Sequence, residues 1–293
     1  MAKLAIIGTG IIGTSLGLAI KKAGVKDLQV VGTDLERGHA SKAKSMGALD
    51  QTEGSLVSAV QNAAIVVIAT PVLAMKDVFE IVGSRLPEGC LVTDTGSSKA
   101  IVMEWAQQYL PVGVSFVGGH PVVGDESSGP EAATADLFKG RPYCIIPGKS
   151  ADRDKVRLLT DMIKTIGGKP YYMDLAEHDS FVTAVSHLPL LLNVALVGCT
   201  ANSPSWDDIA QVASTQYQEM TRLASNDPKT SSDTIFSNRE GVVHWIDSFM
   251  GHLYEIRKIL VDEGEGTSKV LEQVFEKAFI ARAKWLAGDV GPQ

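Results

Sequence analysis

Short apolar runs alternate with segments of helical spacing through the first 174 residues. The first run, residues 3–8, reads KLAIIG; it is continuously apolar after the lysine and ends on a glycine, a pattern typical of a parallel strand buried on both faces. Residues 12–23 then place apolar side chains on one face of a helix. Further strands are predicted at residues 28–33, 64–69, 91–94, 115–117, 143–146 and 170–173, and further helices at residues 75–84, 100–109 and 152–166. This alternation predicts an α/β fold with a doubly wound, mainly parallel sheet of the Rossmann type.

The pattern changes after residue 174, where long helical segments follow without a convincing strand. Helices are predicted at residues 177–199, 205–224, 235–263 and 268–286. We therefore expect two domains, a Rossmann domain over residues 1–174 and an all-helical domain over residues 175–293. The most apolar stretch, residues 181–199, contains His187, Pro189 and Asn193, whereas a membrane span needs about 18 or more uninterrupted apolar residues. A buried helix is expected there, and no membrane partner.

Composition narrows the class of partner. With 45% hydrophobic residues among 293, the chain can bury a large core, and its formal net charge of −7 gives no general attraction to nucleic acid. A small-molecule partner is favoured. Glycines interrupt the first apolar run, unlike a secretory leader, and the odd, widely spaced cysteines show no metal-ligand spacing: Cys90, Cys144 and Cys199. We expect reduced thiols, no metal site and a cytoplasmic location.

A glycine-rich turn joins the first predicted strand to the first predicted helix. Its six residues match the pattern G-x-G-x-x-G and are Gly8, Thr9, Gly10, Ile11, Ile12 and Gly13. In such a loop the first glycine permits the tight turn, the second lets the backbone approach a pyrophosphate, and the third lets the helix pack on the strand. The helix start adds N–H groups that attract phosphate. We interpret the turn as a dinucleotide-binding loop; the alternative is a turn of an unrelated α/β protein.

Asp34 closes the second predicted strand, about 20 residues after the glycine loop. A carboxylate at this place accepts hydrogen bonds from the adenosine ribose and repels a 2′-phosphate, so NAD is favoured over NADP. The alternative is that Asp34 only caps a helix. Thr70 and Pro71 follow the strand at residues 64–69, where they either meet the cofactor at the carboxyl edge of the sheet or simply end the strand.

Two more polar segments follow predicted strands. Residues 93–99 read TDTGSSK and precede a helix, so Ser97 or Ser98 either faces the nicotinamide or caps that helix. His120 lies in the segment GGHP, which we interpret as a rigid glycine–proline turn that presents an imidazole at the sheet edge. Imidazole suits proton transfer near neutral pH, so His120 is a candidate base or hydrogen-bond acceptor, with a structural role as the alternative.

The helical region holds two further candidates. His187 lies in an otherwise apolar segment, either as a pocket residue or as a buried structural histidine. Arg222 has apolar neighbours, and a buried guanidinium is costly unless an anion pairs with it. A substrate carboxylate could bind Arg222 through two hydrogen bonds; Glu219, three residues earlier, could pair with it instead.

Six segments of the chain occur in an order that spans nearly its whole length. They read GTGIIGTSL, VIATPV, VTDTGSSK, GGHPVVGDESSGPEAATADLFKGRPYCIIP, EHDSFVTAVSHLP and MTRLASNDP. Together they resemble the prephenate/arogenate dehydrogenases of tyrosine biosynthesis, and the fourth segment is the most specific. The resemblance implies an oxidative decarboxylation of prephenate to 4-hydroxyphenylpyruvate, in which hydride leaves C4 for NAD, CO₂ leaves C1 and the ring becomes aromatic.

The resemblance also implies roles for individual residues. By the family's pattern, His120 accepts a hydrogen bond or proton from the C4 hydroxyl, and Ser97 helps to orient that hydroxyl and the nicotinamide. Arg222 matches the arginine that anchors a substrate carboxylate. Polar residues that match the lining or gating of the pocket are His178, His187 and Glu126. The helical domain resembles the family's dimerisation domain, which implies a homodimer.

Two positions depart from the family's pattern. Many prephenate-using members read SHLPH, but this chain has Leu190 in place of the second histidine, so arogenate is the alternative substrate. Glu219 stands where the family usually has aspartate. More distant alternatives are a two-domain β-hydroxyacid or imine reductase, although we find no lysine in an SHLP-like context, and an NAD-sensing protein without turnover, which would not need His120 and Ser97.

Overall fold

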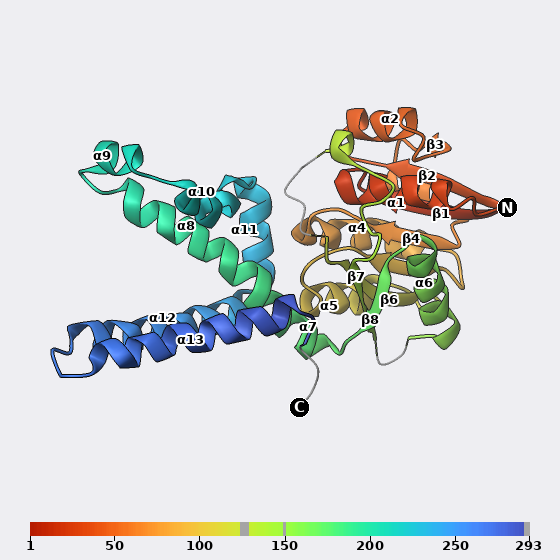
Figure 1. Cartoon of the computed structure of the whole chain (residues 1–293). Helices are drawn as coiled ribbons and strands as arrows, with labels where there is room; N and C mark the ends of the chain where they lie inside the picture. Colours follow the sequence, from red (N-terminus) through yellow and green to blue (C-terminus); the bar gives the residue numbers. More distant parts are fainter. Residues whose placement is uncertain (124–128, 149–150, 290–293) are drawn as a thin grey trace. The chain divides into compact units, whose positions relative to one another are not determined.

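The computed structural model describes residues 1–123, 129–148 and 151–289 (Figure 1). They form two compact units, Met1–Val242 and a second unit that starts at Val243. The change from alternating strands and helices to helices alone falls at Asp174, inside the first unit.

An eight-stranded sheet organises the first part of the chain. Its strands are β1 (Ala2–Ile7), β2 (Leu28–Thr33), β3 (Gln51–Thr52), β4 (Ile65–Ile68), β5 (Leu91–Asp94), β6 (Ser115–Pro121), β7 (Pro142–Pro147) and β8 (Lys169–Tyr172). They lie in the order β3-β2-β1-β4-β5-β6-β7-β8, and every neighbouring pair is parallel except β6 with β7. The order 3-2-1-4-5-6 is that of the Rossmann fold, which confirms the predicted mainly parallel, doubly wound sheet.

Helices cover both faces of this sheet. They are α1 (Ile11–Lys22), α2 (Arg37–Ser45), α3 (Leu56–Val60), α4 (Met75–Val82), α5 (Ala100–Tyr109) and α6 (Arg153–Thr165). Alternate residues of β1 enter two separate hydrophobic clusters, Leu4 and Ile6 with α1 and α6, and Ala5 and Ile7 with α4 and α5. Burial on both faces explains why the strands read as continuous apolar runs.

The structure corrects the interpretation of GGHP as a turn. Strand β6 was expected to end at residue 117, but it continues through Pro121, and His120 pairs with Cys144 of the antiparallel β7. Gly119 is needed for packing, because a Cβ there would lie 2.6 Å from the carbonyl oxygen of Asp94. Strand β3 and the short helices α2 and α3 were not predicted.

The chain beyond Asp174 is helical, as predicted, but its long segments are broken. They are α7 (Leu175–Val182), the π-helical turn η4 (Thr183–His187), α8 (Leu188–Ala201), α9 (Trp206–Gln211), α10 (Thr215–Thr221), the 3₁₀ turn η5 (Arg222–Ser225), α11 (Pro228–Ser237), α12 (Arg239–Val261) and α13 (Thr267–Leu286). The π turn precedes Pro189, whose ring cannot follow a regular α-helical turn without a clash. Helix α11 starts cleanly because the Asp227 carboxylate accepts from the backbone N–H of Thr230.

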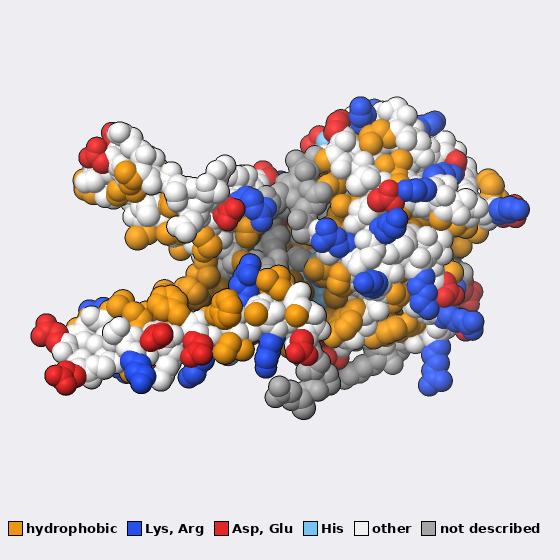
Figure 2. Space-filling model, viewed as in Figure 1, with side chains coloured by type: hydrophobic (Ala, Val, Ile, Leu, Met, Phe, Trp, Pro, Cys, Tyr) orange, Lys and Arg blue, Asp and Glu red, His pale blue; other side chains and the backbone are white. Residues whose placement is uncertain are grey.

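Much apolar surface of the helical part is exposed in the single chain. The segment Leu175–Ala201 is long and apolar enough to cross a membrane by length and composition, and 28% of its most apolar window is buried. The burial expected for residues 181–199 is therefore incomplete. Figure 2 shows further hydrophobic side chains along α12 and α13. The exposed large apolar residues of these two helices include Met250, Tyr254, Phe275 and Phe279.

Candidate active site at the carboxyl edge of the sheet

The glycine loop has the geometry that its sequence predicts. Gly8 adopts a φ of +92°, and a Cβ there would lie 2.6 Å from the carbonyl oxygen of Ala69. A Cβ on Gly13 would lie 1.9 Å from the carbonyl oxygen of Gly8, so the start of α1 packs directly on the turn. Gly10 differs, because nothing lies within 4 Å of the position of its Cβ. Two glycines are thus required by the protein's own packing, and the third leaves open space for a ligand to approach the backbone.

Asp34 fastens this loop to the end of β2. Its Oδ2 accepts from the backbone N–H of Thr9 at 2.6 Å and from the Thr9 hydroxyl at 3.0 Å, while its Oδ1 accepts from the backbone N–H of Glu36 at 2.9 Å. The N-cap of α2 is Glu36, so the interpretation of Asp34 as a helix cap is wrong. Oδ2 already accepts two hydrogen bonds, whereas Oδ1 accepts one and retains a lone pair for a ribose hydroxyl.

Thr70 lies beside the loop at the end of β4 and is followed by Pro71. Its hydroxyl oxygen is buried, and it has no hydrogen-bond partner among the residues that the structure describes. A buried hydroxyl without a partner costs free energy, so this group fits contact with a bound molecule. The open space at Gly10 and the unpartnered hydroxyl of Thr70 together fit a dinucleotide at this edge.

A buried ion pair supports the next loop. Asp94, the last residue of β5, pairs with the ammonium group of Lys99, and both side chains are fully buried. The Asp94 carboxylate also accepts from the backbone N–H of Gly96 at 2.9 Å and of Gly119 at 3.2 Å. Sequence reasoning missed this pair, although an acid and a lysine five residues apart at a strand end were a usable signal. The pair holds the loop that carries Ser97 against β6.

Asp179 of α7 caps helix α5 from a distant part of the sequence. Its Oδ1 accepts from the backbone N–H of Lys99 at 2.7 Å, and its Oδ2 accepts from that of Ala100 at 2.8 Å. The interpretation of Ser97 or Ser98 as the helix cap is therefore wrong. The Ser98 hydroxyl instead bonds that of Ser237 at 2.6 Å, and the half-buried Ser97 remains next to this cap.

His120, His178 and Asp179 form a hydrogen-bonded chain. Asp179 Oδ1 lies 2.8 Å from His178 Nδ1, and His178 Nε2 lies 3.0 Å from His120 Nδ1. The ionised carboxylate can only accept, so His178 Nδ1 carries a proton, and in the neutral imidazole Nε2 then has a lone pair. That lone pair accepts from His120 Nδ1–H, which leaves a lone pair on His120 Nε2. The chain therefore sets the tautomer in which the outer nitrogen of His120 can act as a base.

The surroundings of this hydrogen-bonded chain determine the protonation states of the groups at its two ends, Asp179 and His120. Burial acts to raise the pKa of Asp179, but hydrogen bonds from His178 and from two backbone N–H groups outweigh it and hold that pKa below its ordinary value. Burial lowers the pKa of His120 well below its ordinary value, and the neighbouring His178 and Lys99 lower it further. Asp179 is thus an anion and His120 a neutral imidazole near neutral pH.

His187 and Leu190 lie where the π turn meets α8, and both are buried. Neither ring nitrogen of His187 has a hydrogen-bond partner within the described part of the chain. Burial lowers the pKa of His187 to about 4, although Asp179 acts in the opposite direction. An uncharged, unpartnered imidazole of this kind fits contact with a polar ligand better than the fully satisfied structural role considered above.

Two candidate residues remain, Arg222 and Glu126, and the structure describes only the first of them. Arg222 begins η5 and is exposed, and Asn193 of α8 holds this turn by accepting from the backbone N–H of Leu223 at 3.0 Å. Glu126 lies outside the described residues. His120 and His178 are thus brought into contact, whereas the roles of Arg222, Glu126 and Ser97 stay predictions.

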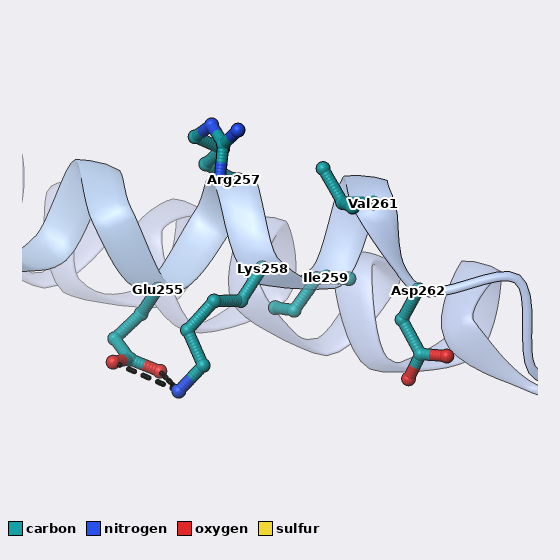
Figure 3. A pocket seen from close by; sticks show the side chains of 6 residues that line it. All are labelled: Glu255, Arg257, Lys258, Ile259, Val261 and Asp262. Carbon is teal, nitrogen blue, oxygen red and sulfur yellow. Dashed lines mark hydrogen bonds and ion pairs between the residues drawn. The ribbon is translucent and has the colours of Figure 1, made fainter.

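A concave region of the second unit lies along α12 and has a different character. Figure 3 shows that its six lining residues come from one short stretch, with the Glu255–Lys258 ion pair at 2.9 Å; they are Glu255, Arg257, Lys258, Ile259, Val261 and Asp262. The side chains of this pair are more than half exposed. It is an ordinary solvated surface pair, and we assign no chemistry to this region.

The family models and the curated relatives identify one family. Residues 16–172 match the model for the nucleotide-binding domain of prephenate dehydrogenase, and residues 174–275 match the model for its dimerization domain. A prephenate dehydrogenase of Bacillus subtilis (strain 168) is 32% identical over 262 residues, which cover 88% of this chain and 70% of that protein. A cyclohexadienyl dehydrogenase of Zymomonas mobilis is 28% identical, with 89% of each chain covered.

A solved structure extends this similarity to three dimensions. The prephenate dehydrogenase of A. aeolicus, solved in complex with hydroxyphenyl propionate and NAD+, has a TM-score of 0.89 and 27% identity, and the match covers 97% of this chain and 98% of that one. The family models alone cover well over half of the sequence. The chain therefore belongs to the prephenate dehydrogenase family.

Proposed function

We propose that this protein is an NAD-dependent prephenate dehydrogenase that forms 4-hydroxyphenylpyruvate and CO₂ in tyrosine biosynthesis. The observation that carries the proposal is the Asp179–His178–His120 chain, which presents a neutral imidazole acceptor beside a dinucleotide-binding edge. The family models, the curated prephenate dehydrogenases and the NAD-bound structural neighbour support the same activity.

The cofactor residues follow from the geometry of the loop. Gly8, Gly10 and Gly13 would let the pyrophosphate approach the backbone and the start of α1, with Thr9, Ile11 and Ile12 completing the loop. Asp34 would accept hydrogen bonds from the adenosine ribose, and Thr70 and Pro71 would border the nicotinamide. Bound NAD supplies the hydride acceptor of the reaction.

The remaining chemistry is assigned to the protein's own groups. His120 Nε2 accepts the proton of the C4 hydroxyl as hydride leaves the same carbon, and Ser97 orients that hydroxyl. The C1–carboxylate bond then breaks, its electron pair completes the aromatic ring, and CO₂ departs. The proton can return from His120 to the ring oxygen, so no net proton is consumed. Arg222 anchors a substrate carboxylate, and His178, His187 and Glu126 complete the pocket.

Domain and partner assignments belong to the same proposal. We place the functional boundary near residue 174, between the two family-model matches, with the NAD-binding domain before it and the helical domain after it. The exposed apolar side chains of α12 and α13 fit a homodimer formed through the helical domain. We further propose a cytoplasmic enzyme with no nucleic-acid or membrane partner.

Arogenate is the second candidate substrate, because Leu190 replaces the histidine expected near the pyruvyl side chain. Leu190 is buried and offers no hydrogen bond to a keto acid. A pocket without that donor discriminates less against the amino-acid analogue.

Steady-state NADH or NADPH formation with prephenate and with arogenate, each with NAD and with NADP, tests the proposal. We expect turnover of prephenate with NAD and a kcat/KM at least about tenfold lower with NADP, since Asp34 repels the 2′-phosphate. The variant Leu190→His should raise the preference for prephenate over arogenate. Turnover of arogenate alone would reassign the substrate, and turnover of neither would refute the proposed activity.

Replacing Arg222 by alanine should raise KM for prephenate about 10- to 100-fold while kcat changes little, because a charge-assisted bond to a carboxylate contributes about 1.5–3 kcal/mol. Initial-rate measurements over a range of substrate concentration give both constants. The matched control is Glu219→Gln, which should leave KM near the wild-type value. An unchanged KM in Arg222→Ala, with loss of stability in both variants, would favour a structural ion pair instead.

A further inference from the structure

Strand pairing and the position of α7 bring three potential metal ligands together. His120 and Cys144 are direct partners in the antiparallel pairing of β6 with β7, and His178 reaches them from α7. One nitrogen of each histidine and the Cys144 sulfur lie within 4.8 Å of one another. The spacing of these residues along the sequence showed no metal pattern, because 24 and 34 positions separate them.

The ligand types and their supports suit a borderline-soft divalent ion. Zinc sites are built from thiolate and imidazole, with bond lengths of about 2.0–2.3 Å, which place tetrahedral ligand atoms about 3.3–3.6 Å apart. His120 Nδ1 and His178 Nε2 are 3.0 Å apart, a few tenths of an ångström short of this spacing, and the Cys144 sulfur lies within 4.8 Å of the histidine ligand atoms. The bond from His178 Nδ1 to the Asp179 carboxylate is the outer support typical of metal-bound histidine.

We propose that His120, Cys144 and His178 form a binding site for Zn²⁺ or a similar transition-metal ion, and that its occupancy switches the enzyme off. The binding itself depends only on the cluster, whereas the inhibition rests on the proposed role of His120 as the base. Lys99 is a cation whose charge acts on His120 and therefore opposes metal binding, and its buried ion pair with Asp94 weakens this opposition.

The proposed inhibition follows from the positions of the protons. A metal on His120 Nδ1 displaces the proton that this nitrogen donates to His178, and the neutral ring then carries its proton on Nε2. That nitrogen can no longer accept the proton of the substrate hydroxyl. The Cys144 thiol must also release its proton to solvent, because the thiolate is the ligand. Metal binding thus competes with the tautomer that the Asp179 chain sets up.

The test uses the full-length enzyme, freed of metal by a chelator and then titrated with Co²⁺ or Zn²⁺ alone. Thiolate-bound Co²⁺ gives a sulfur-to-metal charge-transfer band, so wild type should develop the band and Cys144→Ala should not. Cys90→Ala removes the other buried thiol and should keep the band, and Cys199→Ala controls for the exposed thiol. Each variant's inhibition by Zn²⁺ is expressed relative to its own metal-free rate.

We expect Cys144→Ala to need at least about tenfold more Zn²⁺ for half inhibition than wild type or Cys90→Ala. A wild-type enzyme without the band, or a Cys144→Ala enzyme that keeps it, would overturn the site. The band without inhibition would overturn the switch but not the site. Because the spectrum needs no substrate, failure of the metal site is distinguishable from failure of the proposed dehydrogenase activity.

Discussion

Replacing His120 by asparagine is expected to lower kcat by about 10²- to 10⁴-fold, the usual contribution of a positioned general base. The asparagine amide can occupy the place of Nδ1 and keep a hydrogen bond to His178, but it has no group at the place of Nε2 to accept the hydroxyl proton. NAD affinity, measured by fluorescence titration, should stay within about twofold of wild type, because His120 is not among the residues assigned to the cofactor loop. Steady-state rates at saturating prephenate give kcat.

The control for this variant is thermal unfolding, which should show a folded protein with a transition close to that of wild type. A kcat near the wild-type value would show that His120 is not the base. A loss of kcat accompanied by an equal loss of NAD affinity would instead indicate a disturbed nucleotide site.

Replacing Lys99 by methionine is expected to destabilise the protein by about 3–5 kcal/mol, the cost of leaving one partner of a buried ion pair unpaired. Asp94 is fully buried, and its two backbone donors, Gly96 and Gly119, do not neutralise its charge. Urea unfolding followed by tryptophan fluorescence measures the change. The midpoint of the unfolding transition of the first unit, Met1–Val242, should shift to a lower urea concentration.

The double variant Lys99→Met/Asp94→Asn removes both charges and should recover more than half of this loss, because the asparagine carbonyl can still accept from a backbone N–H. Equal stability of the single and double variants would contradict the ion-pair account. The single variant Lys99→Met also has a kinetic signature. Lys99 helps to lower the pKa of His120, and neutral His120 is the active form, so the acid-side fall of kcat/KM should move to higher pH.

Much of the fold was predictable because its signals are local. The apolar runs at β1, β2 and β5 and the helical spacing of α1 and α5 were found at or within a residue of their observed bounds. The elements that were missed have weak local signals: β3 has two residues, α3 has five, and α2 buries only two small side chains, Ala40 and Ala43. The break inside residues 177–199 could have been inferred from Pro189, since proline disrupts a regular helical turn.

The candidate site was predictable only in part. The glycine loop and Asp34 are local features whose conformation depends on steric constraints within a short stretch of chain. His120 and His178 were singled out by family resemblance, but the hydrogen-bonded chain that joins them, and the capping of α5 by Asp179, depend on residues about 60 to 80 positions apart. Cys144 and Lys99 were given no role, because their significance comes from the side chains packed around them.

The sequence by itself determined the alternation of strands and helices, the steric design of the dinucleotide loop and membership of a dehydrogenase family, since each depends on residue types in a fixed local order. Only the tertiary structure decided which ring nitrogen of His120 carries the proton, which side chain neutralises Asp94 and which side chains surround Cys144. These properties arise from hydrogen bonds and charges among β5, β6, β7 and α7, and electrostatic interactions in a buried site depend on distance in space rather than on separation along the chain.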